Sequence, residues 1–292
     1  MTFTRTASGL ANYPKFYGVD VIVYTEGKLG RDSDDLGDPV DDIIFYSAIL
    51  KIAIPRKTTK IKCVGSKTDV IAYAHKVEQH KIKDEIAIVD RDLCGITHST
   101  YPFVCLVKTW GYSWENDLWT IDLCQPLIKQ LTNASAPSLL SKFQNLARRM
   151  RLLAAMDAAL QVKDQALLSK ASSYGGVGLR FETAQPVPIA EVRRLRSAFV
   201  ASNAYTCPIA RLVLTNAAAL PANRLVQGHL WANMVCGLLT RLYKDQTADM
   251  APSKRMLRNL ALSYMSTNTR KVLGPRAVAH YKTSIKAALT HS

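Results

Sequence analysis

Four short runs rich in apolar and β-branched residues, separated by helix-like segments, dominate the first 131 residues of the chain. The runs are residues 19–24 (VDVIVY), 60–64 (KIKCV), 85–89 (EIAIV) and 103–108 (FVCLVK). Such runs are typical of buried strands in a parallel sheet. Helices are expected at 41–50, 69–80 and 113–131, the last with a kink or break at Pro126. This β-α-β-α-β-β order predicts an α/β fold with a mostly parallel sheet flanked by helices.

The second part of the chain has a different pattern, which is basic and mostly helical. Residues 132–137 (TNASAP) are small and turn-forming, and they predict a linker between a domain at 1–131 and a helical domain at 138–292. The cluster SSYGGVG at 172–178 predicts a break, and 177–181 a short strand. The helices expected in this domain are 139–168, 189–202, 225–245, 252–265 and 275–289.

Charge is divided unevenly along the chain, whose net charge is +15. Residues 1–125 carry 15 basic and 17 acidic residues, whereas residues 126–292 carry 23 and 6, so the whole excess lies in the second part. General solubility needs net charge of either sign but not this segregation. A basic part beside a carboxylate-containing part favours a surface that holds a polyanion and a site that acts on it.

Basic residues of the second part form clusters on expected helices. A single cluster is usually a solvated face, but several in one domain favour a surface that follows a phosphate backbone. Lys28, in the loop after the first strand, is a further candidate for phosphate contact. The candidate nucleic-acid-binding residues of the clusters are Arg148, Arg149, Arg151, Arg193, Arg194, Arg196, Lys254, Arg255 and Arg258.

Several protein classes do not fit the sequence. No apolar run reaches the roughly 18 residues that would span a bilayer, and the first residues lack a signal peptide, so we expect a cytoplasmic protein without membrane contact. The six cysteines form no C-x-x-C pair, which argues against a zinc module or a disulfide scaffold. The sequence also lacks a Walker A loop, a Rossmann glycine fingerprint and a G-x-S-x-G elbow.

Carboxylates follow two of the expected strands. Glu26 comes just after the first strand and is followed by Gly27, and Asp90 and Asp92 come just after the third. In parallel sheets the reactive groups gather at the carboxyl ends of the strands, and residues i and i+2 of extended backbone project to the same side. If the first and third strands are neighbours, Glu26, Asp90 and Asp92 converge and need a divalent cation to neutralise them. Hard oxygen ligands favour Mg²⁺ or Mn²⁺.

Two residues elsewhere have competing interpretations. Glu115, in GYSWEND, is either a fourth acidic ligand or a first-turn helix carboxylate with Ser113 as N-cap. His229, in GHLW, is either a phosphate donor or, more often for such a residue, a histidine of the core.

The Glu-Gly after one strand and the D-x-D after another resemble the TOPRIM domain. The segments VIVYTEGK, DDIIFYSAIL, IAIVDRDLCG and GYSWENDLW narrow the resemblance to OLD-like TOPRIM proteins, and within them to the effectors of the PARIS anti-phage defence system. The resemblance covers about residues 18–240, with GHLW as the alignable block of the helical part. In the family an aspartate usually falls within a few residues of E-G-K, whereas here Asp41 and Asp42 follow an insertion at 29–40.

The resemblance implies a metal-dependent endonuclease that cleaves transfer RNA and halts translation. It implies an ABC-type ATPase partner that holds the effector inactive, and a homodimer after release. Glu26, Asp90, Asp92 and Glu115 are then the expected catalytic and metal-binding residues, with Glu26 alternatively a general acid–base. The attacking group is either a water or the 2′-hydroxyl of the RNA. The alternatives for the whole protein are an OLD-type DNA nuclease and a non-catalytic TOPRIM subunit of the ATPase complex.

Overall fold

A computed structural model describes residues 12–27, 41–97, 100–168 and 187–291, and the chain divides into two compact units. The first unit comprises residues 1–91, 101–110 and 262–292, and the second comprises 92–100 and 111–261. These units differ from the domains expected at 1–131 and 138–292. The expected linker at 132–137 joins two helices of the second unit, and the last 31 residues return to the first unit.

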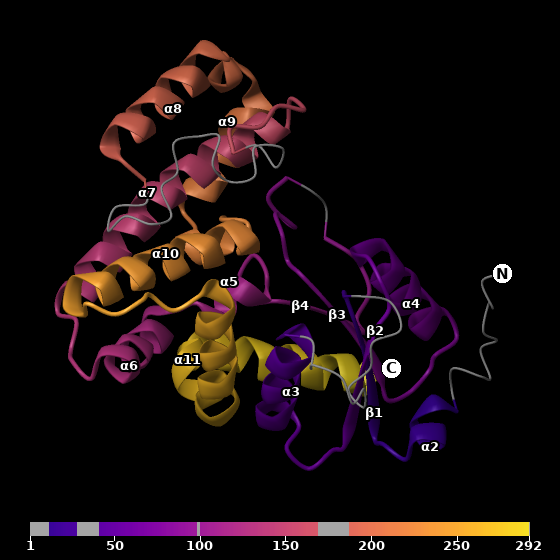
Figure 1. The fold of residues 1–292 in the computed structure, drawn as a ribbon. Coiled ribbons are helices and arrows are strands. Elements are labelled where there is room, and N and C mark those ends of the chain that lie inside the picture. Colours follow the sequence, from indigo (N-terminus) through magenta and orange to yellow (C-terminus); the bar gives the residue numbers. More distant parts are fainter. Residues whose placement is uncertain (1–11, 28–40, 98–99, 169–186, 292) are drawn as a thin grey trace. The chain divides into compact units, whose positions relative to one another are not determined.

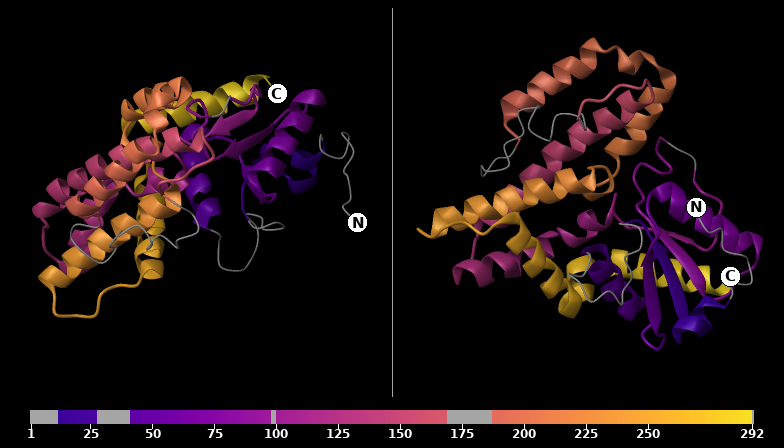
Figure 2. Two further views of the ribbon diagram at one scale, coloured as in Figure 1. Left: turned by 90° about the horizontal axis from the view of Figure 1, so that it is seen from above. Right: turned by 45° about the vertical axis from the view of Figure 1, so that its right-hand side comes forward.

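The first unit is built on a four-stranded sheet in which every pairing is parallel (Figure 1). Its strands are β1 (Val21–Thr25), β2 (Thr59–Cys63), β3 (Glu85–Val89) and β4 (Leu106–Lys108), in the order β2-β1-β3-β4. The four strands expected from the sequence are therefore confirmed, with ends shifted by up to three residues, and so is the α/β class. Figure 2 shows the same strands side by side from a further direction.

Helices cover both faces of this sheet (Figure 1). Alternate residues of β1 and β3, such as Ile22 and Val89, pack with Val70 and Val77 of α4 (Lys67–Gln79) in one buried cluster. A capping box between Ser66 and Asp69 starts α4. The other face is covered by α3 (Asp41–Ala53) and by the last part of α11 (Lys254–His291). The short helix α2 (Tyr13–Tyr17) precedes β1 and was not expected from the sequence.

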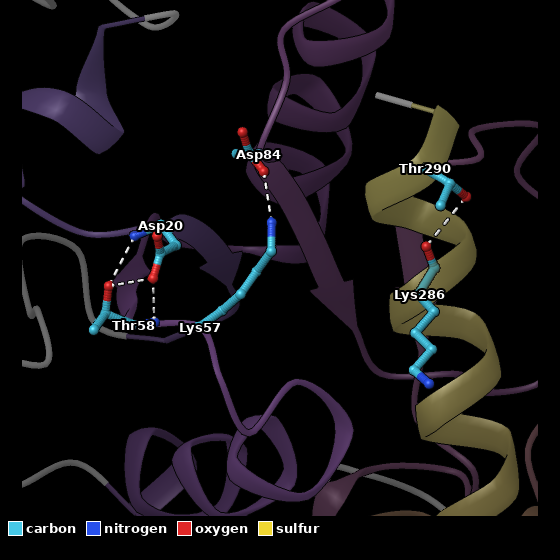
Figure 3. Close-up of polar contacts among 6 residues, drawn as sticks. All are labelled: Asp20, Lys57, Thr58, Asp84, Lys286 and Thr290. Atoms are coloured by element: carbon cyan, nitrogen blue, oxygen red, sulfur yellow. Dashed lines mark hydrogen bonds and ion pairs between the residues drawn. The ribbon is translucent and has the colours of Figure 1, made fainter.

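The amino-terminal edge of the sheet is held by polar contacts (Figure 3). Thr58, just before β2, donates from its backbone N–H and its hydroxyl to Asp20 Oδ2, at 2.6 and 2.7 Å, and its hydroxyl oxygen accepts the Asp20 N–H at 2.9 Å. Lys57 pairs with Asp84, just before β3, at 2.9 Å. The Thr58 hydrogen bonds lower the pKa of Asp20. These acidic residues are therefore occupied in joining strand starts, and the candidate chemistry lies at the opposite edge.

The second unit is helical. Its helices are α5 (Trp114–Leu118), α6 (Ile121–Thr132), α7 (Ser138–Gln161), α8 (Ile189–Ala201), α9 (Pro208–Ala218), α10 (Gly228–Gln246) and the start of α11, with short 3₁₀ turns η2 (Ala204–Thr206) and η3 (Ala222–Arg224). The break in the expected helix 113–131 lies between α5 and α6, whereas Pro126 sits inside α6. The helix α9 was not expected. The break expected at 172–178 and the strand at 177–181 lie outside the described residues.

Folding redistributes the charge that the sequence separates. The segment 262–292 carries five basic residues and no acidic residue, and it belongs to the unit that contains the sheet. By sequence count, the first unit therefore has a net charge of +7 and the second +8. Both units are basic, so the carboxylates of the sheet lie within a positively charged unit. Among the described residues, no helix is both long enough and apolar enough to cross a membrane.

Candidate functional site

Glu26 and Asp90 meet at the carboxyl-terminal edge of the sheet. The strand β1 lies between β2 and β3, so the order of the strands reverses there, and parallel α/β sheets bind ligands at such a switch point. Glu26 follows β1 and Asp90 follows β3, and the Asp90 backbone N–H donates to Glu26 Oε1 at 3.0 Å. The strands β1 and β3 are neighbours, so the condition that the sequence analysis set for Glu26 and Asp90 to share an edge is met.

A glycine next to Glu26 lets a further carboxylate approach this edge. Gly27 has φ +146°, and a Cβ at this position would lie 2.8 Å from Asp42 Oδ2 and 2.8 Å from Cys63 Sγ. Asp42, in the first turn of α3, therefore reaches the backbone beside Glu26. The insertion at 29–40 lies between Gly27 and Asp42 in the sequence, so the spacing of the motif did not assign Asp42 to the site. The signal that could have suggested it is its place in the pair Asp41–Asp42 at the start of an expected helix.

Tyr46 lies one helical turn after Asp42 and is buried. Burial raises its pKa well above the usual value, and the negative charge of Asp90 raises it further, with contributions from Tyr281, Glu26 and Asp42. The phenol therefore stays protonated beside the acidic edge and retains a hydrogen-bond donor. Sequence reasoning did not single out this residue.

Asp92 belongs to the second unit and does not lie on extended backbone. The strand β3 ends at Val89, and Asp92 has φ +49°, in the left-handed region, with its N–H donated to Tyr112 O at 2.8 Å. The expectation that Asp92 lies on extended backbone after the third strand is therefore wrong. One residue separates them, so covalent geometry alone keeps their Cα atoms within about 7 Å.

Glu115 is buried in the second unit with both carboxylate oxygens engaged. Ser113, the N-cap residue of α5, donates its hydroxyl to Oε2 at 2.6 Å, and His229 Nδ1 lies 2.9 Å from Oε1. Burial acts to raise the pKa of Glu115, but the hydrogen bonds from His229 and Ser113 outweigh it, and the pKa is lowered. The same contact raises the pKa of His229. The helix-start position with Ser113 as N-cap is thus confirmed for Glu115.

The GHLW segment lies against the segment that contains Glu115. A Cβ at Gly228 would lie 1.8 Å from Ser113 Oγ, so only glycine allows this approach. Trp231 Nε1 donates to Trp119 O at 3.0 Å, which fixes the start of α10 on the end of α5. The His229 side chain is 69% exposed, so its interpretation as a core histidine is wrong.

Most of the predicted nucleic-acid-binding residues are exposed on helices of the second unit. Arg149 is half-buried and donates to Val187 O, and Arg194 pairs with Glu191 one turn earlier. Lys28 lies outside the described residues. The exposed members are Arg148 and Arg151 on α7, Arg193, Arg194 and Arg196 on α8, and Lys254, Arg255 and Arg258 on α11.

The parallel sheet and the carboxylates at its carboxyl-terminal edge define the class of the protein but not its family. The class is an α/β protein whose parallel sheet carries carboxylates at its switch point. No family model matches the chain, and no curated protein matches it. Over the described residues, no three histidine, cysteine, aspartate or glutamate side chains are grouped closely enough to hold a metal ion.

Proposed function

We propose that the chain is a metal-dependent nuclease of the TOPRIM type whose catalytic edge contains Glu26 and Asp90. The observation that carries the proposal is the contact of Glu26 with Asp90 at the switch point of the sheet, where the Asp90 backbone N–H donates to Glu26 Oε1. Asp42 beside Gly27 adds a carboxylate at the same edge. Carboxylates gathered at one edge repel one another, and a bound cation would relieve this repulsion.

The donor set is chemically suited to Mg²⁺ or Mn²⁺, because carboxylate oxygens are hard ligands. Glu26 and Asp90 would hold the ion, with Asp92 brought near Asp90 by the chain. A bound cation would supply charge to stabilise a phosphate transition state and would lower the pKa of an attacking water. Glu115, proposed from sequence as a fourth ligand, would first have to release Ser113 or His229.

Glu26 is also the group best placed to move a proton. Its Oε1 is oriented by the Asp90 N–H, and its side chain is half-buried, so the carboxylate is held while remaining accessible. The attacking group is a water or the 2′-hydroxyl of an RNA.

The proposed substrate is transfer RNA, and the proposed role is that of an anti-phage effector. The net charge of +15, carried by both units, supports a polyanionic substrate. The resemblance of the motifs to OLD-like TOPRIM effectors supports the narrower statement. On that resemblance the protein is held inactive by an ABC-type ATPase in the cytoplasm and forms a homodimer when released, and cleavage halts translation in the infected cell.

The direct test incubates the purified chain with total transfer RNA and, separately, with plasmid DNA, each with Mg²⁺ or with EDTA. We expect cleavage of the RNA only with Mg²⁺. Cleavage of the DNA alone would support an OLD-type DNA nuclease, and no cleavage of either would support a non-catalytic subunit.

The matched variants compare the two edges of one sheet. Glu26→Gln removes the charge at the carboxyl-terminal edge and should abolish cleavage. Asp20→Asn removes a charge at the amino-terminal edge, where Thr58 holds the side chain, and should leave cleavage within twofold of the wild type. Equal activity of the two variants would refute the role of Glu26.

A further inference from the structure

A groove of about 350 Å³ lies within the second unit, and none of its lining residues is among the groups proposed for catalysis. Its walls come from the end of α6, from α10, from the connection between α10 and α11, and from the start of α11. The apolar side chains that line it are Leu131, Tyr243, Met250, Pro252, Met256 and Leu260.

The exposure of this lining argues against a small-molecule pocket. Met250 is 94% exposed and Met256 is 49% exposed. A pocket for a small ligand buries most of the ligand among enclosed side chains, which a wall this open cannot do. Large apolar side chains left in solvent instead mark a surface for a macromolecule, and methionine adapts its shape to the side chains of a partner.

Exposed basic residues lie next to lining residues in the chain. Lys129 and Lys244 are exposed beside Gln130 and Tyr243, and Lys254 and Arg255 are exposed in the turn of α11 that carries Met256. Two acidic residues, Asp245 and Asp249, occur in the same segments, and Asp245 forms ion pairs with Lys142 and Arg241. The segments that form the groove therefore carry four exposed basic residues, Lys129, Lys244, Lys254 and Arg255, which we call the basic border, together with an apolar floor.

The apolar floor and the basic border together favour one kind of partner over others. A second copy of the chain would bring another basic surface to the groove, because the second unit has a net charge of +8 and the whole chain +15. A nucleic acid would satisfy the basic border but would leave the methionine floor uncovered, since bases stack on aromatic rings. An acidic helix with one apolar face satisfies both parts at once.

We propose that this groove docks an acidic amphipathic helix of a protein partner, with its apolar face on Met250 and Met256 and its carboxylates toward the basic border. The proposal does not depend on nuclease activity. The affinity is expected to depend on both parts, because the methionines supply the apolar contact and the lysines select the sign of the charge.

The probe is an 18-residue helical peptide with leucine at positions i, i+3, i+4 and i+7 and glutamate at most other positions. It is added to the full chain labelled with ¹³C in its methionine methyl groups. We expect the signals of Met250 and Met256 to shift and saturate, and those of Met150 and Met156, which are buried in α7, to stay in place. Raising NaCl from 50 to 300 mM should weaken binding at least tenfold.

Matched variants separate the groove from other exposed apolar residues. Met250→Glu should weaken binding at least tenfold without loss of fold, because the side chain is almost wholly exposed. Ile209→Glu, on α9 and 62% exposed, should bind the peptide as the wild type does. The proposal is overturned if the methionine signals do not move, or if a peptide with lysine in place of glutamate shifts them equally. It is also overturned if a short RNA shifts them, or if they move with protein concentration alone.

Discussion

Glu85 is a carboxyl group buried at the start of β3, and its replacement by glutamine should remove a pH dependence from the stability of the first unit. The side chain has no exposed surface. Tyr24 donates its hydroxyl to Oε2 at 2.9 Å, whereas Oε1 has no hydrogen-bond partner among the described residues. Burial raises the pKa of Glu85 from 4.5 to about 7, although the Tyr24 hydrogen bond and the positive charge of Lys62 both act to lower it.

The sign and size of the effect follow from this pKa. The folded state holds the proton of Glu85 up to about pH 7, whereas the unfolded chain releases it near pH 4.5, so the free energy of unfolding falls as the pH rises between these values. One pH unit corresponds to 1.36 kcal/mol, which makes the total loss about 3 kcal/mol. Glutamine remains neutral and keeps an acceptor for Tyr24. The Glu85→Gln variant should therefore exceed the wild type by up to about 3 kcal/mol at pH 8 and match it near pH 4.

Hydrogen exchange of the β1 and β3 amides measures this difference locally, which suits a chain with two compact units. At each pH the variant is compared with the wild type, so the intrinsic pH dependence of exchange cancels. Asp84→Asn is the matched control, because Asp84 is the preceding residue but is about half exposed and paired with Lys57. It should show no pH-dependent difference between pH 6 and 8. A Glu85→Gln difference that stays constant over this range would refute the reasoning.

Two further predictions concern close approaches of glycine. Gly27→Ala should destabilise the first unit by about 2 kcal/mol or more, because the new Cβ meets Asp42 and Cys63 at 2.8 Å and the residue has φ +146°. Gly18→Ala, with φ +63° and no atom within 4 Å, should cost only about 1 kcal/mol, and equal losses in thermal unfolding would contradict the packing argument. Gly228→Ala should displace Ser113 and weaken the Glu115–His229 pair, and an NMR titration should then show the pKa of His229 moving back toward its usual value. An unchanged His229 titration would show that the pair does not need this approach.

The strands were predictable because each is a short run rich in apolar and β-branched residues, a composition typical of buried strands. The pairing of β1 with β3 was left open by the sequence, because a parallel sheet with crossover helices allows more than one order of strands. The conformation after β3 did not follow. Asp92 takes a left-handed conformation that aspartate tolerates, and its N–H is held by Tyr112, a contact between residues 20 positions apart.

Contacts distant in sequence account for the other differences. Asp42 reaches Gly27 across an insertion, and a periodicity argument has no means of detecting such an approach. The helix 275–289 was expected from its own pattern, but that pattern does not reveal that this segment covers the sheet, where Tyr281 accepts the Trp110 N–H. The helix α9 escaped notice because its exposed Ile209 and Leu212 blur the apolar face.

The central claim is that Glu26 and Asp90 together hold a divalent cation. Electron paramagnetic resonance of Mn²⁺ titrated into the purified chain measures the free ion, and therefore the binding, directly. The account predicts saturable binding by the wild type and by Asp20→Asn, competition by Mg²⁺, and loss of this binding in Glu26→Gln and Asp90→Asn. Mn²⁺ binding that is unchanged in the two edge variants would contradict it.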